Sequence, residues 1–126
     1  MSPLVRAVET AMILIGDKVK MIPEKKLIDR GLGELEGKER SLYDSKKYWD
    51  YRGNYSDHGV EAIQDLFKRT SDFINEIKQK YNDKTILIVS HGATVRALHY
   101  CITSYTEDEE FLKLDVPNCG VFEYDL

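Results

Sequence analysis

The sequence predicts an α/β protein in which helices pack against a sheet. One observation behind this prediction is the clear helix pattern of residues 60–81, where apolar side chains recur at positions i, i+3 and i+4. The other is the short apolar run of residues 86–89, which has the pattern of a buried strand and is followed by a further helix pattern over residues 93–104. Buried strands that alternate with helices are typical of α/β folds.

The first part of the chain predicts a helix and a short strand. In the helix, expected over residues 2–15, Ser2 is a suitable N-cap and Pro3 occupies the first helical position, where its missing backbone N–H has no cost. Gly16 is a suitable end for this helix. Residues 19–22 then alternate apolar and basic side chains, as in a strand with one buried face.

The middle of the chain is glycine-rich and then aromatic. Residues 27–37 contain three glycines within seven residues, which predicts a shaped loop. Residues 39–58 are polar and rich in aromatic side chains, so they form either a lid or insertion of short helices, or a layer packed against the edge of the core. We favour the second interpretation because aromatic side chains carry the most burial per residue. After a turn at residues 117–120, residues 121–126 alternate as a final strand.

Length, charge and cysteine content restrict the class of protein. The 126 residues suit one domain, which we expect to cover residues 1–126. A net charge of −4 gives no reason to expect nucleic acid or an anionic membrane as a partner. No apolar run approaches the roughly 20 residues that cross a bilayer. Two cysteines are too few for a disulfide framework, so we expect a cytoplasmic protein, and no histidine or cysteine has the spacing of metal ligands.

Three side chains are candidates for chemistry. His91 lies between Ser90 and Gly92 where the predicted strand meets a helix, and open α/β sheets bind ligands at such junctions. The free N–H groups and positive dipole of a helix N-terminus suit phosphate. Arg6 can bind an anion through two hydrogen bonds, and Asp29 beside the glycine loop can act as a general acid. Taken singly, Arg6 also fits an exposed helical arginine and Asp29 a turn residue.

Four segments occur in a specific order along the chain: S-P-L-V-R-A-V-E-T-A, D-R-G-L-G-E-L-E-G, V-S-H-G-A-T-V-R and N-C-G-V-F-E-Y. Together they resemble the histidine phosphatase superfamily, in its phosphoglycerate-mutase-like branch. The resemblance implies a three-layer α/β/α fold around a central sheet. It also implies a phosphatase or phosphomutase that needs no metal or other cofactor and acts on a phosphorylated small molecule through a phosphohistidine.

The resemblance also implies a role for each matching residue. Arg6 corresponds to the phosphate-binding arginine of the family, and His91 to its second histidine, which helps to bind the phosphoryl group and to stabilise its transfer. Gly92 and Ala93 would line the same pocket with backbone N–H groups. Asp29 stands where the family usually has a glutamate as proton donor, and an acid that is shorter by one methylene must be brought closer to reach the same atom.

One motif of the family does not occur in the sequence. No R-H-G is present, and its histidine is the one that becomes phosphorylated. We therefore expect a sheet truncated at the N-terminus and a chain that is inactive alone. We also expect either marginal folding or a homo-oligomer or partner that covers the exposed sheet edge. The alternative function is a non-catalytic remnant that binds a phosphorylated ligand or another protein. The short segment 39–58 favours a phosphatase over a mutase, because it leaves little chain to enclose a large substrate.

Overall fold

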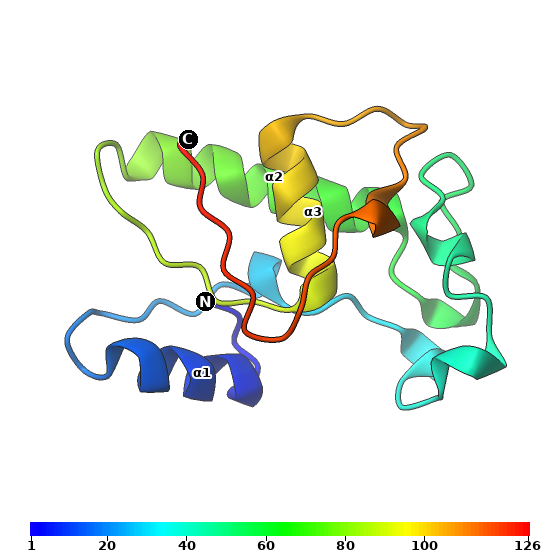
Figure 1. Cartoon of the computed structure of the whole chain (residues 1–126), viewed down its shortest axis with the longest axis horizontal. Coiled ribbons are helices and arrows are strands. Elements are labelled where there is room, and N and C mark those ends of the chain that lie inside the picture. Colours follow the sequence, from blue (N-terminus) through cyan, green and yellow to red (C-terminus); the bar gives the residue numbers. More distant parts are fainter.

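The computed structural model describes residues 1–126 and contains three α-helices: α1 (Val5–Ile15), α2 (Ile63–Lys80) and α3 (Gly92–Thr103). Helix α3 crosses α2 steeply and contacts it, whereas α1 lies apart from both (Figure 1). The rest of the chain consists of extended segments and short 3-10 helices: η1 (Lys25–Leu27), η2 (Gly33–Leu35), η3 (Arg40–Leu42), η4 (Lys47–Trp49), η5 (Asp57–Gly59) and η6 (Phe111–Lys113). The three helices predicted from the sequence are therefore confirmed, with ends that differ by a few residues.

The prediction of a three-layer α/β/α sheet is wrong for this structure, which contains no β-strand. Residues 19–22, 86–89 and 121–126 were each expected to be strands, and all three stretches lack regular secondary structure. A strand requires a series of backbone hydrogen bonds with a neighbouring strand. Residues 86–89 accept a single backbone hydrogen bond, from the N–H of Ser2 to the carbonyl of Val89 at 2.8 Å. Without neighbours, an apolar run stays extended but forms no ladder.

The N-terminal residues lie between two of these extended segments. The amino group of Met1 donates to the carbonyl of Ile22 at 2.8 Å, and the carbonyl of Met1 accepts from the N–H of Glu24 at 2.8 Å. On the other side, Ser2 is bonded to the carbonyl of Val89. Leu4, and not Ser2, is the N-cap residue of α1. These contacts place the first turn of α1 beside the N-terminus of α3.

The core lies mainly between α2 and α3, because the apolar face predicted from the pattern of α2 packs against α3. The largest cluster of buried side chains comprises Ile63, Leu66, Phe67, Ala97, Tyr100 and Phe111. A second cluster comprises Leu27, Phe73, Ile74, Ile77 and Leu98. Since Leu27 belongs to η1, the second cluster fixes the start of the glycine-rich loop against α2.

The aromatic segment of residues 39–58 packs against the edge of the core, as predicted. Trp49 and Tyr51 contact the largest cluster, and Tyr48 is buried in a smaller one. The ring of Trp49 contacts the guanidinium groups of Arg30 and Arg96, whose Cζ atoms are 5.1 and 5.0 Å from its centroid. These two cation–π contacts help to hold the segment against the core.

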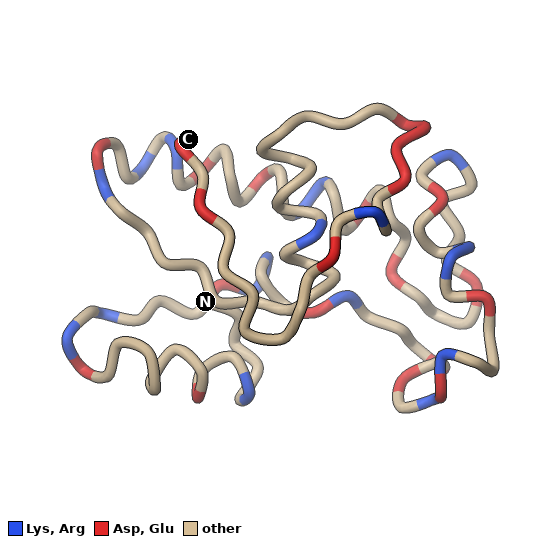
Figure 2. The backbone as a smooth tube through the Cα atoms, in the orientation of Figure 1, with Lys and Arg blue, Asp and Glu red and all other residues tan.

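Charges of both signs are interspersed along the chain, and the stretch between Lys84 and Arg96 carries none (Figure 2). That uncharged stretch includes the segment that leads into α3. None of the helices combines the length and the apolar character needed to cross a membrane.

Candidate functional site

Arg6, Asp29 and His91 come from three distant parts of the sequence and lie together at the N-terminus of α3. Nη2 of Arg6 is 2.8 Å from Oδ2 of Asp29, and Nε of Arg6 donates to Nδ1 of His91 at 3.2 Å. The same oxygen of Asp29 is 3.7 Å from Nδ1 of His91. The first turn of α1, the loop after η1 and the residue before α3 thus each supply one side chain to a single cluster.

The hydrogen bonds of His91 assign its tautomer. A guanidinium N–H can only donate, so Nδ1 accepts from Arg6 and the ring proton is on Nε2. Nε2 then donates to Oγ of Ser2 at 2.7 Å. This Oγ also accepts from the N–H of Leu4 at 3.3 Å. Because His91 donates to Ser2, it cannot take the hydroxyl proton of Ser2, and the two residues are not arranged as a nucleophile and its base.

Burial lowers the pKa of His91 below its ordinary value. The side chain is only 6% exposed, so water does little to solvate the imidazolium form. The negative charge of Asp29 opposes this effect, and the positive charges of Arg6 and Arg69 add to it. His91 is therefore neutral at pH 7 and offers one N–H, on Nε2. The positive charge of the cluster comes from Arg6, whose side chain is 62% exposed.

The first turn of α3 has the features of an anion site. His91 is its N-cap residue, in an extended conformation, and no side chain caps the turn or adds a negative charge to it. The first N–H groups of a helix have no partner within it, which applies to Gly92 and Ala93. A Cβ atom placed on Gly92 would meet nothing within 4 Å, so the space beside its backbone is open. These N–H groups and the helix dipole favour a phosphate beside Arg6.

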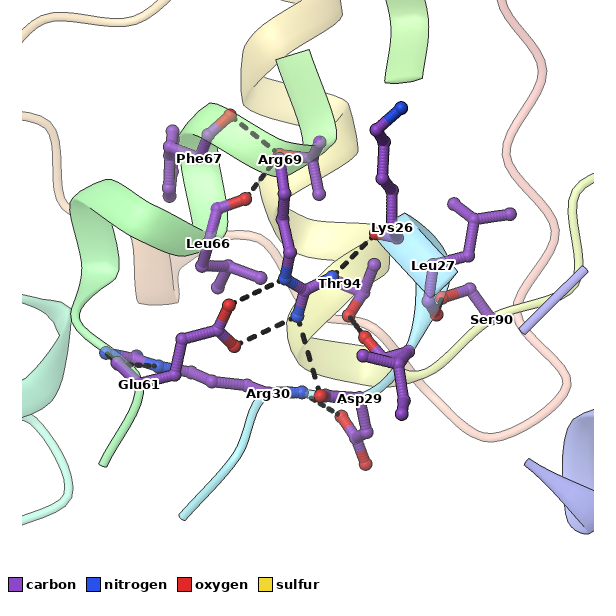
Figure 3. Close-up of polar contacts among 12 residues, drawn as sticks. Lys26, Leu27, Asp29, Arg30, Glu61, Leu66, Phe67, Arg69, Ser90 and Thr94 are labelled. Atoms are coloured by element: carbon purple, nitrogen blue, oxygen red, sulfur yellow. Dashed lines mark hydrogen bonds and ion pairs between the residues drawn. The ribbon is translucent and has the colours of Figure 1, made fainter. Parts of the chain in front are cut away.

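The loop that carries Asp29 is held by contacts with Glu61, just before α2, and with Arg69 of α2. Oδ1 of Asp29 accepts from the N–H of Arg30 at 3.0 Å, and the buried guanidinium of Arg30 donates twice to the carbonyl of Glu61, at 3.0 and 2.8 Å. Burial lowers the pKa of Arg30 to about 10, so the group stays charged at pH 7. Arg69 reaches from α2 to the carboxylate of Glu61 and to the loop (Figure 3).

The geometry of the site does not by itself identify the protein family, but comparison with protein families does. The model of the histidine phosphatase superfamily (branch 1) matches residues 1–126. The chain belongs to this superfamily. The resemblance carried by the four sequence segments is thereby confirmed.

Similar proteins of the histidine phosphatase superfamily include enzymes of two kinds. A phosphoglycerate mutase-like protein 4 from Arabidopsis thaliana is 29% identical over 78% of this chain and 46% of its own length. A metal-independent phosphoserine phosphatase from the same plant is 26% identical over 91% of this chain and 52% of its own. A 2,3-bisphosphoglycerate-dependent phosphoglycerate mutase from Rhizobium etli is 30% identical over 98% and 64%. The chain thus spans about half to two thirds of these relatives. No solved structure matches it significantly.

Sequence reasoning named the central side chains of this histidine phosphatase domain and missed those around them. Ser2 was read as a helix cap, whereas it is buried and bonded to His91. Charged residues within the predicted helix of residues 60–81 would ordinarily face solvent, yet the side chains of Glu61, just before α2, and Arg69, within α2, are only 21% and 17% exposed. They form a pair in which Nε of Arg69 is 2.6 Å from Oε1 of Glu61. Because Glu61 lies two residues before the start of α2, helical spacing does not relate it to Arg69, and the sequence does not distinguish a buried pair from a solvated one.

The other two histidines lie outside the site. Nδ1 of His58 is 3.3 Å from a carboxylate oxygen of Glu34, and Nδ1 of His99 is 2.7 Å from the hydroxyl of Tyr124. No three histidine, cysteine, aspartate or glutamate side chains are grouped to hold a metal ion. His91 is therefore the single imidazole of the cluster that includes Arg6.

Proposed function

We propose that the chain binds the phosphate group of a phosphorylated small molecule at Arg6, His91 and the N-terminus of α3, as part of a metal-independent phosphatase. The observation that carries this proposal is the meeting of Arg6, Asp29 and His91 at an uncapped helix N-terminus. In the proposed complex the exposed guanidinium of Arg6 turns from Asp29 to the phosphate, since it can bind two oxygens at once. The N–H groups of Gly92 and Ala93 bind further oxygens.

In phosphoryl transfer, the same groups would stabilise charge that spreads over the equatorial oxygens of the phosphoryl group. His91 would contribute a hydrogen bond from Nε2 once the phosphate displaces the hydroxyl of Ser2. Asp29 would act as the acid, because its carboxyl group lies beside Arg6 and His91 at the proposed phosphate site. A protonated carboxyl group can then donate its proton to the leaving oxygen.

A second function, binding without turnover, is favoured by one specific observation. The ring of His91 is buried and each of its nitrogen atoms has a hydrogen-bond partner. A phosphohistidine requires an imidazole nitrogen whose lone pair is free to attack. The tautomer of His91 also rules out Ser2 as a nucleophile with a histidine base. We propose that these 126 residues alone bind phosphate and do not hydrolyse phosphate esters.

Between phosphatase and mutase, we propose a phosphatase. The support is the size and packing of segment 39–58, whose residues Trp49 and Tyr51 are engaged with the core. Such a segment leaves little chain to enclose a substrate during transfer between two positions. The similar proteins include one named as a phosphoserine phosphatase and one named as a phosphoglycerate mutase, so their names do not decide the question.

Calorimetric titration with inorganic phosphate, vanadate and a sugar phosphate tests the binding proposal. We expect the wild-type chain to bind all three and Arg6→Ala to lose at least about tenfold in affinity, since a charge-assisted hydrogen bond contributes about 1.5–3 kcal/mol. Arg52→Ala is the matched control, because Arg52 is equally exposed at 64% and pairs with Glu107 and Asp108 elsewhere. Equal loss in the two variants, or no binding by the wild type, would refute the proposal.

Hydrolysis of a generic aryl phosphate tests the second function. We expect no turnover above background by these 126 residues, and the same result for His91→Ala. Robust turnover that is abolished by His91→Ala would instead show that the chain is catalytic by itself. Because binding and hydrolysis are measured separately, phosphate binding without turnover would mean that these 126 residues alone bind phosphate and do not catalyse its transfer.

Self-association is a further proposal for this chain. No sheet edge exists to be covered, but α1 exposes apolar side chains: Val5, Met12, Ile13 and Leu14. Apolar side chains left exposed on a helix are typical of surface that a second molecule covers. Light scattering at several protein concentrations should show species larger than 14.6 kDa. A monomer at all concentrations, with a cooperative melt, would contradict the proposal.

A further inference from the structure

Four consecutive carbonyl groups of the loop before and at Asp29 accept hydrogen bonds from side chains of distant residues. Arg69 donates to the carbonyl of Lys26 at 2.6 Å and to the carbonyl of Asp29 at 3.5 Å (Figure 3). Between these two, the hydroxyl of Ser90 donates to the carbonyl of Leu27 at 2.7 Å. The hydroxyl of Thr94 donates to the carbonyl of Ile28, also at 2.7 Å. We call Arg69, Ser90 and Thr94 the loop clamp.

Thr94 connects the two halves of the candidate site directly. It lies in the first turn of α3, three residues after His91, and it is fully buried. A threonine in a helix often bonds to a carbonyl of the preceding turn, but the hydroxyl of Thr94 bonds to the carbonyl of Ile28, which precedes Asp29. The helix that carries His91 therefore also holds the backbone that carries Asp29.

Arg69 holds the same loop from α2. Its Nε and Nη2 atoms donate to the two carboxylate oxygens of Glu61, at 2.6 and 3.0 Å. A planar guanidinium bound in this two-point manner cannot rotate, so its remaining N–H groups point in fixed directions. Those groups meet the carbonyls of Lys26 and Asp29.

The ion pair with Arg6 does not fix the position of the Asp29 side chain. This side chain is 36% exposed, and its partner Arg6 is 62% exposed. Exposed ion pairs contribute little and are easily broken. The hydrogen bonds of the loop clamp are partly buried, as is the bond from the N–H of Arg30 to Oδ1 of Asp29. The clamp fixes the backbone that carries Asp29 and the bond from Arg30 orients its carboxylate, so the exposed ion pair with Arg6 is not what determines where the carboxylate lies.

We propose that Thr94 and Arg69 are positioning residues that fix the carboxylate of Asp29 beside His91 and Arg6. This inference rests on the proposed function only in treating Asp29 as a working group of the site. A member of this cluster displaced by about 1 Å can lose about a hundredfold in rate. The clamp therefore sets the geometry in which Asp29 could replace a longer glutamate.

The test compares Thr94→Val, which removes the hydroxyl at nearly constant shape, with Thr94→Ser, which keeps it. Each is made in the wild-type chain and in Asp29→Asn. The readout is the pKa of the His91 imidazole, followed by NMR as a function of pH. Since the charge of Asp29 raises this pKa, we expect it to fall in Thr94→Val and to remain near the wild-type value in Thr94→Ser. In Asp29→Asn, Thr94→Val should cause no further change.

Two outcomes would overturn the inference. If Thr94→Val lowers the melting temperature but leaves the pKa of His91 unchanged, the hydroxyl only stabilises the fold. If Thr94→Val shifts that pKa equally in the wild type and in Asp29→Asn, it acts on His91 without Asp29. Should Thr94→Val fail to fold, Arg69→Lys serves instead, because lysine keeps the charge beside Glu61 but cannot reach both carbonyls. No phosphate is needed, so loss of phosphate binding and loss of positioning are separate results.

Discussion

Replacing Asp29 by asparagine should strengthen the binding of inorganic phosphate. The change keeps the shape of the side chain and removes one negative charge from the candidate site. Oδ2 of Asp29 lies 2.8 Å from Nη2 of Arg6 and 3.7 Å from Nδ1 of His91. A phosphate bound by Arg6 at the N-terminus of α3 would therefore lie close to this carboxylate, and the two negative charges would repel each other. Asp29 also forms an ion pair with the guanidinium group of Arg6, and this ion pair must break before Arg6 can bind phosphate.

The size of the effect follows from the exposure of the site. Two unit charges 4 Å apart interact by about 1 kcal/mol in water and about 4 kcal/mol at an effective dielectric constant of 20. The side chains of Asp29 and Arg6 are 36% and 62% exposed, so the lower end of that range applies. Release of the exposed ion pair adds between about 0 and 1 kcal/mol. We expect a total of about 1–2 kcal/mol, which is about a five- to thirtyfold lower Kd for phosphate.

Calorimetry at neutral pH and low salt measures this Kd directly, because salt screens such interactions. Asp108→Asn is the matched control, since it changes the net charge equally at an exposed carboxylate that pairs with Arg52. Asp29→Asn should bind phosphate more tightly than both the wild type and Asp108→Asn. Unchanged or weaker binding by Asp29→Asn would refute the geometry, because it would mean that phosphate does not lie beside this carboxylate.

Two further predictions concern stability. Because burial lowers the pKa of His91 below its ordinary value of 6.5, the unfolded chain takes up the proton first as the pH falls. The free energy of unfolding, measured by urea denaturation, should therefore decrease as the pH drops through 6.5 towards the folded-state pKa. The decrease should be smaller for His91→Gln. An equal dependence of the unfolding free energy on pH in the two proteins would contradict this. Gly33→Ala should cost at least about 2 kcal/mol, because φ is +53° and the new Cβ would collide with the backbone of His58 and Gly59. Gly37→Ala, with φ of +73° but open space, should cost only about 1 kcal/mol, and equal losses would rule out the collision.

The helices could be predicted because their signal is local. Apolar residues at helical spacing place α2 at residues 63–80 within the predicted range of 60–81. The sheet could not be predicted reliably from residues 86–89, since a strand forms only if another strand supplies hydrogen bonds along its length. In this structure the backbone partner of that segment is Ser2 alone. An apolar pattern shows that a segment can be buried in a sheet, but it does not show that neighbours are present.

The three central residues of the candidate site could be predicted from the sequence, whereas the residues that hold them in place could not. Arg6, Asp29 and His91 could be named because each stands in a segment that resembles the histidine phosphatase superfamily. The loop clamp could not be named, because the donors and acceptors are far apart in sequence: Arg69 is 43 residues from Lys26, and Thr94 is 66 residues from Ile28. Nothing in the neighbourhood of Thr94 distinguishes a hydroxyl bonded to a distant loop from one bonded within its own helix.

The sequence by itself determined the helical segments, the family and the identity of the cluster residues, because amphipathic spacing and motif residues are properties of short stretches of chain. Only the tertiary structure decided that the extended segments pair with no strand and that Nε2 of His91 donates to Ser2. It also decided that α3 carries both His91 and the threonine that holds the loop of Asp29. These features depend on which backbone and side-chain groups meet in space, and hydrogen bonds between distant residues leave no local pattern to read.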